Sequence, residues 1–487
     1  MLRLAVTAAL AAAVLCSAAS AQTAPGAALW RQMAVMDVEA AYALVRDNHP
    51  AALPEVGDDA FRAALDAAAA KARARAERVT SFEGYTATLS GFATALGDKH
   101  IWHRPTVRVA AYQWPGLSIS RRGGAWRVNE EVRSGSETPL AGATLVGCDG
   151  RSADALAEER LGGFRAVWSI EAQRNQQAPW LLIDDGNPFL TRPATCDFDV
   201  GGKRVTHTLQ WRPASAGGIA PYLTRAVSVG QAGWGVRQAG GGYWIAIQGL
   251  DSRTQPVLEQ VQKDIEAIRA APFVVLDMRG NGGGASQYGD TLARMLTGDR
   301  YYQRVQTGGT ADCVGPWRAS AGNLKHLQDF LSDNRPRLSA ELIAYLENEV
   351  RMMQEAIAGG RAFTQPPRAC PAADRPAPPP LDGRGSLMKG RLIVLTDNAC
   401  FSSCLLVTDL FRRLGALHVG EATDAATRYM EVREIPLPSG AGYFSTLQKV
   451  AFGAPRQIGP FVPARLYPGD IADTAGLEAW VAEQARR

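Results

Sequence analysis

Histidine is scarce in this chain of 487 residues, which contains six copies. A histidine that acts as a base must therefore come from a short list: His49, His100, His103, His207, His326 and His418. Neither these histidines nor the cysteines have the spacing of metal ligands, so we expect no metal and no cofactor. The net charge of +4 is small for the length, and the basic residues are spread out. This pattern argues against a nucleic-acid partner.

Long apolar runs are missing beyond the N-terminus. No later run reaches the roughly 18 residues that a membrane-spanning helix needs, so we expect no membrane span. Residues 1–21 have the pattern of a secretory signal peptide: Arg3 is basic, residues 4–15 are apolar, and Ala19 to Ala21 suit cleavage before Gln22. The sequence therefore predicts a periplasmic or secreted protein.

Cysteine is also infrequent, with seven copies. Cys16 lies in the signal peptide, and the remaining even number favours disulfides in an oxidising compartment. We expect Cys148 to pair with Cys196, because both fall in one candidate domain. We expect Cys313 to pair with Cys370, because they flank one insertion.

The order of local patterns predicts an α/β protein with several parts. Residues 22–105 show apolar residues at helical spacing, and residues 106–215 alternate short strands with turns. Residues 216–487 follow a strand–helix–strand pattern with continuously apolar strands, which is typical of a parallel sheet covered on both faces. An insertion at about 298–388 interrupts this pattern and includes a proline-rich run, Pro366–Pro380, that should be extended.

Two small-residue turns follow apolar strands in the last part. Residues 396–404, TDNACFSSC, lie between the apolar run 391–395 and a helical pattern at 405–414. A serine there exposes its hydroxyl, and the following N–H groups lie at a helix N-terminus. Residues 273–284, FVVLDMRGNGGG, end in glycines that let a backbone N–H approach an oxyanion. We expect folding to bring these two turns into one active site.

The first turn contains two candidate nucleophiles, Ser402 and Ser403. Each has a structural alternative, because serine is a favoured helix N-cap. Cys400 and Cys404 bracket the pair. They either form a small bridge that stiffens the turn or are two small residues packed at the start of the helix.

These motifs resemble those of the tail-specific, or C-terminal processing, protease family, which includes the tricorn core protease. Leu276–Gly284, LDMRGNGGG, is similar to the family's DLRGNPGG turn, and Asn398–Ser403 stands where the family has GTASAS. The resemblance implies a crotonase/Clp-protease-like α/β core, an N-terminal helical domain and a PDZ-like β-rich insert. Leu140–Gly150, LAGATLVGCDG, is similar to the strand and turn of a PDZ domain.

The same resemblance implies roles for individual residues. Ser402 becomes the nucleophile, and the N–H groups of Gly283 and Ser403 become the oxyanion hole. Asp277 and Arg279 are expected to hold the glycine turn through charge-assisted hydrogen bonds.

The base distinguishes two branches of the family. One branch uses a lysine in a GEKTFGKG segment, but the matching segment here, Gly420–Thr427, contains no lysine and has Ala426 in the base position. Gly97–His100, GDKH, is similar to the LxDxHT turn of the tricorn-like branch. This similarity implies His100 as general base, with a near-neutral intrinsic pKa that suits the role. His103 is the second choice.

Other candidate bases receive structural roles, and the group that orients His100 is not assigned. Lys449 is expected on an exposed strand, His418 in the core and His49 in a loop. The position where tricorn-like enzymes have a glutamate falls on Arg456, which cannot serve. Three acidic alternatives stay unranked: Glu421, Glu431 and Glu434.

The sequence therefore predicts an exported serine endopeptidase that cleaves peptide or protein substrates through Ser402 and His100. The alternative is a catalytically inactive relative that binds peptides or envelope proteins, favoured by the missing lysine and glutamate. A third hypothesis is an ester or amide substrate that is not a peptide, because a fold does not fix a function. The oligomeric state does not follow from these patterns.

Overall fold

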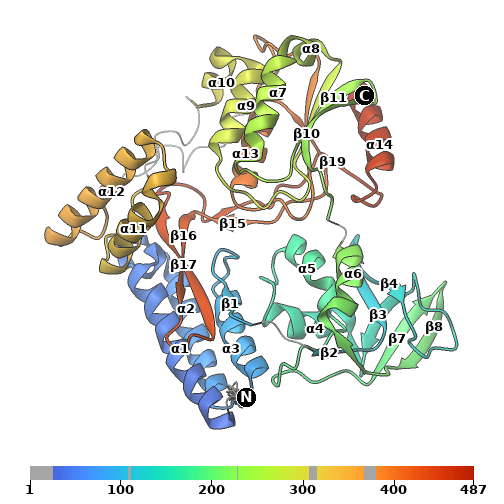
Figure 1. The fold of residues 1–487 in the computed structure, drawn as a ribbon. Helices are drawn as coiled ribbons and strands as arrows, with labels where there is room; N and C mark the ends of the chain where they lie inside the picture. The colour runs from blue at the N-terminus through green and yellow to red at the C-terminus, as the bar shows by residue number, and fades with distance from the viewer. Residues whose placement is uncertain (1–25, 108–110, 228, 307–314, 367–379) are drawn as a thin grey trace, which may run out of the picture.

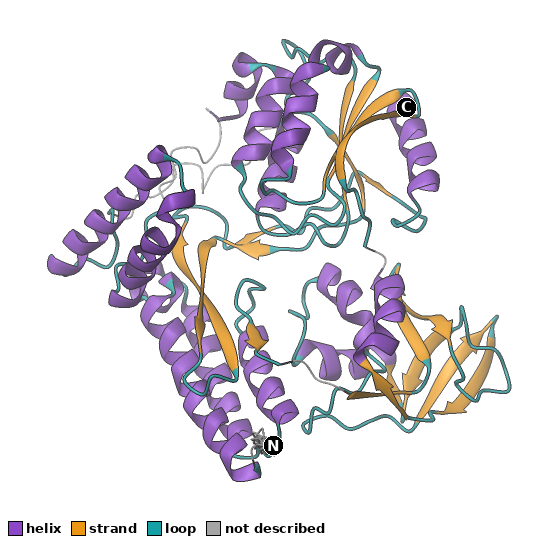
Figure 2. Ribbon diagram, viewed as in Figure 1, coloured by secondary structure: helices purple, strands orange, loops and turns teal. Residues whose placement is uncertain are grey.

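The computed structural model describes residues 26–107, 111–227, 229–306, 315–366 and 380–487 (Figure 1). The signal-peptide pattern, Cys313, Cys370 and most of the proline-rich run lie outside these ranges. The described chain mixes helices and sheets in an N-terminal helical part, a β-rich part and an α/β part (Figure 2). Within these ranges, none of the helices combines the length and the apolar character needed to cross a bilayer.

The α/β part is built on a six-stranded sheet with the order β10-β11-β12-β13-β14-β19. Its strands are β10 (Trp234–Ala239), β11 (Gly242–Ile247), β12 (Phe273–Asp277), β13 (Arg391–Thr396), β14 (Leu417–Gly420) and β19 (Arg465–Leu466). β10 runs antiparallel at one edge, and the other strands are parallel. Every residue of β12 is buried, as expected for a central strand covered on both faces.

Helices cover both faces of this sheet, so the predicted parallel sheet with two covered faces is confirmed (Figure 1). One face packs against α7 (Thr254–Lys263), α8 (Ile265–Ala270), α9 (Gln287–Thr297), α10 (Asp299–Gln306) and α13 (Ser403–Arg413). The other face packs against α14 (Thr474–Arg486).

The N-terminal helices share a hydrophobic core with a hairpin from the far end of the chain. These helices are α1 (Ala27–Asn48), α2 (Asp59–Ala76) and α3 (Phe82–Ala95), and the hairpin strands are β16 (Tyr429–Pro436) and β17 (Gly442–Val450). β1 (His103–Pro105), which follows α3, pairs with β17 and completes an antiparallel sheet in the order β1-β17-β16. The segment between α3 and β1 is thereby fixed against the C-terminal part of the chain.

Within the described residues, the β-rich part contains a sheet of six strands and three α-helices. The strands are β3 (Leu117–Arg122), β4 (Ala125–Glu131), β5 (Thr144–Cys148), β6 (Arg151–Ser152), β7 (Thr195–Val200) and β8 (Lys203–Thr208), and the helices are α4 (Ala153–Ala157), α5 (Glu171–Gln177) and α6 (Ala216–Val227). β2 (Ala111–Trp114) and β9 (Arg212–Ser215) form a separate pair. The expected Cys148–Cys196 disulfide is present and joins β5 to β7.

The insertion forms a helical hairpin of α11 (Ala321–Asn334) and α12 (Ala340–Ala358), which projects from the body of the molecule (Figure 1). Its small core includes Trp317, Leu327, Leu346 and Met353.

The register of β12 and β13 places the two predicted turns side by side. The strands are parallel neighbours, with Asp277 opposite Leu395. Because the carboxyl ends of parallel strands meet at one edge of a sheet, the glycine turn and the serine turn leave the sheet together.

Candidate active site

Ser402 lies at the sharp connection between β13 and α13. Its backbone has φ 57° and ψ −128°, and α13 starts at the next residue. A residue other than glycine with positive φ costs about 1–3 kcal/mol and persists where the surroundings enforce it. The Cys400–Cys404 disulfide spans this residue, so the bridged alternative for the two cysteines is the one observed. The hydroxyl makes no helix-capping hydrogen bond.

His100 meets Ser402 across a sequence separation of 302 residues. The His100 Nε2 lies 2.9 Å from the Ser402 Oγ, within the reach required of a general base. On the other side of the ring, Nδ1 lies 2.9 Å from the Asp98 Oδ1. The ring also packs against Phe401, with 4.4 Å between ring centroids.

Asp98 fixes the orientation of the imidazole. Its Oδ1 also accepts a 2.8 Å hydrogen bond from the His100 backbone N–H, and its Oδ2 accepts one from the Thr427 hydroxyl. Burial by itself would raise the pKa of Asp98, but hydrogen bonds from His100 and Thr427 and the charge of His100 lower it below its ordinary value. An ionised Asp98 keeps the proton on Nδ1, so Nε2 is left to accept the hydroxyl proton of Ser402.

The rival histidines do not contact Ser402. The His103 Nδ1 lies 3.5 Å from the Ser90 Oγ, and burial lowers the pKa of His103 to about 3. His418 is 3% exposed in β14, with its Nε2 2.8 Å from the Thr396 hydroxyl, so its expected core position is confirmed. His49 lies in the connection that follows α1, as expected, and is fully buried, stacked 4.4 Å from Phe61.

The other charged candidates are occupied elsewhere. Lys449 extends over the Trp317 ring of the insertion, with its Nζ 5.2 Å from the ring centroid. Glu434 accepts hydrogen bonds from Trp102 and Arg104. Glu421 accepts a 2.6 Å hydrogen bond from Asn398. Burial, reinforced by the charge of Asp397, raises the pKa of Glu421 to about 8. Arg456 pairs with Asp58.

The glycine turn approaches the nucleophile closely. A Cβ added to Gly283 would lie 2.7 Å from the Cβ of Ser402 and 2.9 Å from the backbone N of Ser403. The N–H of Gly283 donates to the Asn281 Oδ1 at 2.9 Å, whereas the expected role was donation to an oxyanion. Asn281 also donates to the Ile247 carbonyl, so its amide fixes the turn.

Two buried acidic residues hold the glycine turn in place. Asp277 and Arg279 form a fully buried pair, in which the Arg279 Nη2 lies 2.7 Å from the Asp277 Oδ2, as the sequence predicted. Asp397, at the end of β13, accepts backbone hydrogen bonds from Gly280 and Gly230, each at 2.9 Å. Burial raises the pKa of Asp397 to about 7. This carboxyl group connects the glycine turn with the start of the serine turn.

A cavity of about 700 Å³ contains Ser402 and His100. More than half of its lining is apolar or small. The lining includes Ala285, Leu405, Leu406, Ala426, Thr427, Met430, Glu431, Val432, Ala451, Ala454 and Ile458. Ala426, which stands at the position of the family's lysine, therefore faces the same space as the nucleophile.

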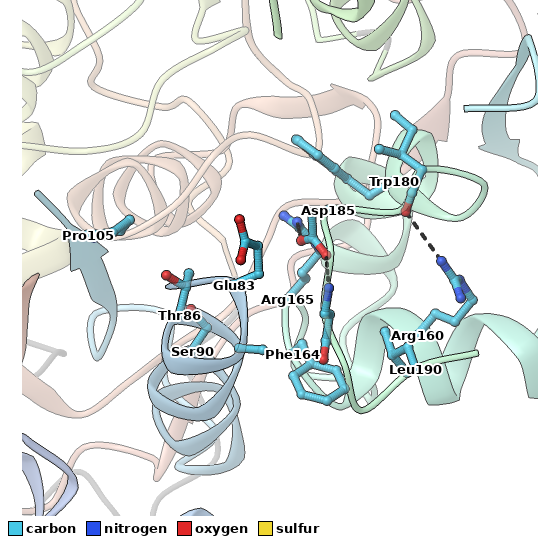
Figure 3. Close-up of a pocket in the computed structure, with 13 residues that line it drawn as sticks. Glu83, Thr86, Ser90, Pro105, Arg160, Phe164, Arg165, Trp180, Asp185 and Leu190 are labelled. Atoms are coloured by element: carbon cyan, nitrogen blue, oxygen red, sulfur yellow. Dashed lines mark hydrogen bonds and ion pairs between the residues drawn. The ribbon is translucent and has the colours of Figure 1, made fainter. Parts of the chain in front are cut away.

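A smaller cavity of about 230 Å³ lies between α3 and the β-rich part (Figure 3). Glu83 and Thr86 of α3 face it from one side, and Arg165, Trp180 and Asp185 from the other. Arg165 is paired with Asp185. None of the candidate catalytic groups lines this hollow, so the chemistry belongs to the larger cavity.

Sequence reasoning missed Asp98 as the partner of His100, because the search for an acidic group was directed at the end of the chain. The signal was present: Asp98 lies two residues before His100, inside the GDKH turn. Sequence reasoning also missed Thr427, which lies on the short strand β15 (Ala426–Thr427) and whose hydroxyl donates a hydrogen bond to Asp98.

Residues 242–458 match the model of peptidase family S41. The matched range is slightly less than half of the chain and contains both turns, whereas Asp98 and His100 precede it. This part of the chain is a serine-type peptidase domain, which belongs to the hydrolases. Comparison with curated protein sequences gives no match.

Solved structures show a similar fold over nearly the whole chain. The crystal structure of mature CPAF has a TM-score of 0.58 and 15% identity, covering 94% of this chain and 96% of that one. Mature CPAF complexed with lactacystin gives a TM-score of 0.57 and 15% identity, covering 94% and 99%. At this identity the similarity concerns the fold. The tricorn protease also matches, with a TM-score of 0.36 and 11% identity, covering 94% of this chain and 37% of that one. This TM-score is too low to support a structural conclusion.

Proposed function

We propose that this chain is an exported serine endopeptidase in which Ser402 is the nucleophile, His100 the general base and Asp98 the group that orients His100. The supporting observation is the pair of 2.9 Å contacts that connect the hydroxyl through the imidazole to the carboxylate. The similar sequence pattern and fold of serine peptidases agree with this assignment.

The reaction follows from the positions of these groups. The Ser402 oxygen attacks the peptide carbonyl while its proton passes to the His100 Nε2, and Asp98 stabilises the resulting imidazolium. The imidazolium then protonates the leaving amine, which departs and leaves an acyl group on Ser402. Water, deprotonated by His100, attacks this ester and releases the acid and the free serine.

The developing oxyanion needs hydrogen-bond donors. The N–H of Ser403 is at the N-terminus of α13 and makes no hydrogen bond within the described residues. We assign it as the first donor, since helix N-termini favour negative charge. The N–H of Gly283 becomes the second when it exchanges the Asn281 oxygen for the oxyanion.

The inactive alternative is favoured by this same contact between Gly283 and Asn281. If the hydrogen bond persists with substrate bound, one donor is lost, and losing a donor costs about 10²–10³ in kcat. The chain would then bind peptides without cleaving them efficiently. The strained backbone of Ser402 argues against this alternative, because such strain is concentrated at functional positions.

Export is supported by the signal-peptide pattern together with two described disulfides. Disulfides persist in oxidising compartments and are rare in the cytosol. We therefore place the mature protein in the periplasm or outside the cell.

The β-rich part is proposed as a PDZ-like module that presents a peptide to the cleft by strand addition. Its α5 contacts the active-site part directly. The Gln173 Nε2 donates to the Asp424 Oδ1 at 2.9 Å, and Gln176 donates to the Asn398 carbonyl. These contacts lie next to the strand that carries Thr427, so the two parts are in physical connection.

A fluorophosphonate probe tests the assignment directly. We expect wild-type protein to be labelled at Ser402 and to cleave casein, and we expect Ser402→Ala to lose both while it stays folded. Ser403→Ala is the matched control, because it keeps the backbone N–H and should retain labelling. Lactacystin, which is bound to CPAF in a similar structure, is a second probe. Activity retained in folded Ser402→Ala would eliminate the proposal, and absence of labelling across pH 6–9 would favour the inactive alternative.

A further inference from the structure

The cleft beside Ser402 contains a carboxylate that the proposed reaction does not use. Glu431 of β16 lines the cavity of about 700 Å³ that also contains Ser402 and His100. Its side chain is exposed. Its backbone carbonyl accepts a 3.3 Å hydrogen bond from the Gln448 side chain. Within the described ranges its carboxylate makes no hydrogen bond or ion pair, and it is the one carboxylate of the cavity lining. A free charge at this place is available to a substrate.

The backbone of Glu431 has a strained conformation, and its carboxylate makes no hydrogen bond that would account for the strain. Its φ is 61°, a region that a glycine or an asparagine occupies at lower cost. The ladder with β17 pairs Met430 with Lys449 and Val432 with Leu447, and Glu431 is left out of the pairing. Gln448, the residue opposite Glu431, is unpaired as well, and the register on either side is unchanged, so the ladder is interrupted at this position without an inserted residue. The strained Glu431 lines the same cavity as the nucleophile, and such strain commonly accompanies function.

The nearby charges favour a positive group at this position. Glu349 of α12 is 6% exposed, and its Oε2 has no partner among the described residues. Burial raises the pKa of Glu349, Lys449 lowers it, and the charge of Glu431 raises it further. Because burial favours the neutral form of Glu349, the carboxylate charge at this end of the cleft is that of Glu431, which attracts a cation.

The other positive groups around the cleft do not neutralise Glu431. Arg428 donates to the Val56 carbonyl at 3.2 Å, and its guanidinium lies 5.7 Å from the Tyr429 ring centroid. Lys449 lies over Trp317. Among the described residues, neither cation forms an ion pair with the Glu431 carboxylate, so this group is open to a positively charged ligand.

The shape and chemistry of the cleft fit an extended peptide. Among the described residues, β16 is the terminal strand of its sheet, and its outer edge is not paired with another strand. Apolar side chains also line this cavity, and one of them, Leu406 of α13, is 42% exposed. We propose that Glu431 is a specificity-determining residue that binds a lysine or arginine side chain of an otherwise apolar, extended peptide substrate. This inference rests on the proposed function, because it concerns the same cleft.

Binding to the inactivated protein separates this inference from catalysis. We would measure dissociation constants of Ser402→Ala for fluorescent octapeptides of Leu, Ala and Phe that carry one Lys, Gln or Glu at each position in turn. We expect the best Lys peptide to bind about two- to five-fold more tightly than its Gln counterpart, the range of an exposed ion pair. Adding Glu431→Gln should remove the preference, and adding Glu431→Lys should transfer it to the Glu peptide.

The control is Glu341→Gln, because Glu341 is an exposed carboxylate on α12 outside the cavity. Glu341→Gln changes the net charge of the protein by the same amount as Glu431→Gln, but it should leave the preference for the Lys peptide unchanged. Equal binding of Lys and Gln peptides to Ser402→Ala, a preference that survives Glu431→Gln, or no binding of any peptide would each overturn the inference. Cleavage of the same peptides by wild-type protein reports separately on the proposed function, which stands if cleavage occurs without a charge preference.

Discussion

The His100 Nε2 lies 2.9 Å from the Ser402 Oγ, although the two residues are 302 positions apart. Three features create this proximity. The C-terminal strand β17 pairs with β1, which directly follows the His100 turn. The Ser445 hydroxyl of β17 donates to the His100 carbonyl at 2.9 Å. The Asp98 carboxylate then accepts a hydrogen bond from Thr427. The histidine is therefore held by the same C-terminal region that surrounds the nucleophile.

Asp98→Asn should reduce kcat by about 10²–10⁴-fold, because an amide no longer selects the tautomer in which Nε2 accepts a proton. The protein should stay folded, since asparagine preserves the shape of the side chain. Steady-state cleavage of a fluorogenic peptide and thermal unfolding measure the two effects.

Glu434→Gln is the matched control for this substitution. Glu434 was a rival acidic group in the sequence, but it is bound to Trp102 and Arg104. We expect its loss to change kcat by less than about three-fold, because it does not touch His100. A large effect of Glu434→Gln together with a small effect of Asp98→Asn would reverse the assignment.

Removing the Cys400–Cys404 bridge should impair catalysis more than folding. Closing so short a loop stabilises a protein by about 2 kcal/mol in the chain-entropy model. The positive φ of Ser402 costs a similar amount, about 1–3 kcal/mol. Without the bridge, Ser402 can relax to an ordinary backbone conformation, so we expect Cys400→Ala/Cys404→Ala to lower kcat at least ten-fold.

The Cys148–Cys196 bridge provides the comparison, because it lies in the β-rich part. Cys148→Ala/Cys196→Ala should lower the melting temperature and leave probe labelling of Ser402 intact. Equal loss of labelling in the two double variants would show that the bridge at Ser402 has no special role.

Part of this site was predictable because its signals are local. The apolar strands, the glycine turn and the serine turn each occupy a short stretch of sequence, and parallel strands bring such turns to one edge. His100 was found by its motif. Asp98 lies in the same motif and was overlooked, because the acidic group was sought by analogy near Arg456.

Other features depend on contacts that no local pattern encodes. The N-terminal helices share their core with β16 and β17, which lie near the other end of the chain. The hydrogen bond between Asn281 and the N–H of Gly283 depends on a side-chain rotamer. The disulfide between Cys400 and Cys404 was one of two alternatives, and their spacing alone did not decide between them.

Stability should decrease with rising pH because of Glu421. Burial, with the charge of Asp397, raises the pKa of Glu421 from 4.5 to about 8. The folded state therefore binds this proton more tightly than the unfolded state, and its contribution is lost as the pH rises from about 5 to 8. Glu421→Gln removes the titration while its carbonyl still accepts from Asn398. We expect the melting temperature of the variant, relative to wild type, to rise between pH 5 and 8; a constant difference would contradict the assignment.

Lys99 connects the catalytic turn to the β-rich part through a buried acid. Its Nζ lies 2.9 Å from the Asp424 Oδ2, and Asp424 also accepts hydrogen bonds from Gln173 and Gln176. Lys99→Met keeps the side-chain length but leaves a buried carboxylate without its cation. We expect a loss of about 1–3 kcal/mol in the free energy of unfolding, measured in urea. Because Lys99 is next to His100, kcat should also fall several-fold.

A double-mutant cycle measures the interaction between Lys99 and Asp424 separately from the effect of each single substitution. Asp424→Asn removes the buried charge, so Lys99→Met should cost much less in that background than in wild type. A coupling of about 1 kcal/mol in the free energy of unfolding, accompanied by partial recovery of kcat, would support a contact that holds the histidine turn against the β-rich part. Additive losses would show that Lys99 and Asp424 act independently, and the two parts would then be connected through the glutamine contacts of α5.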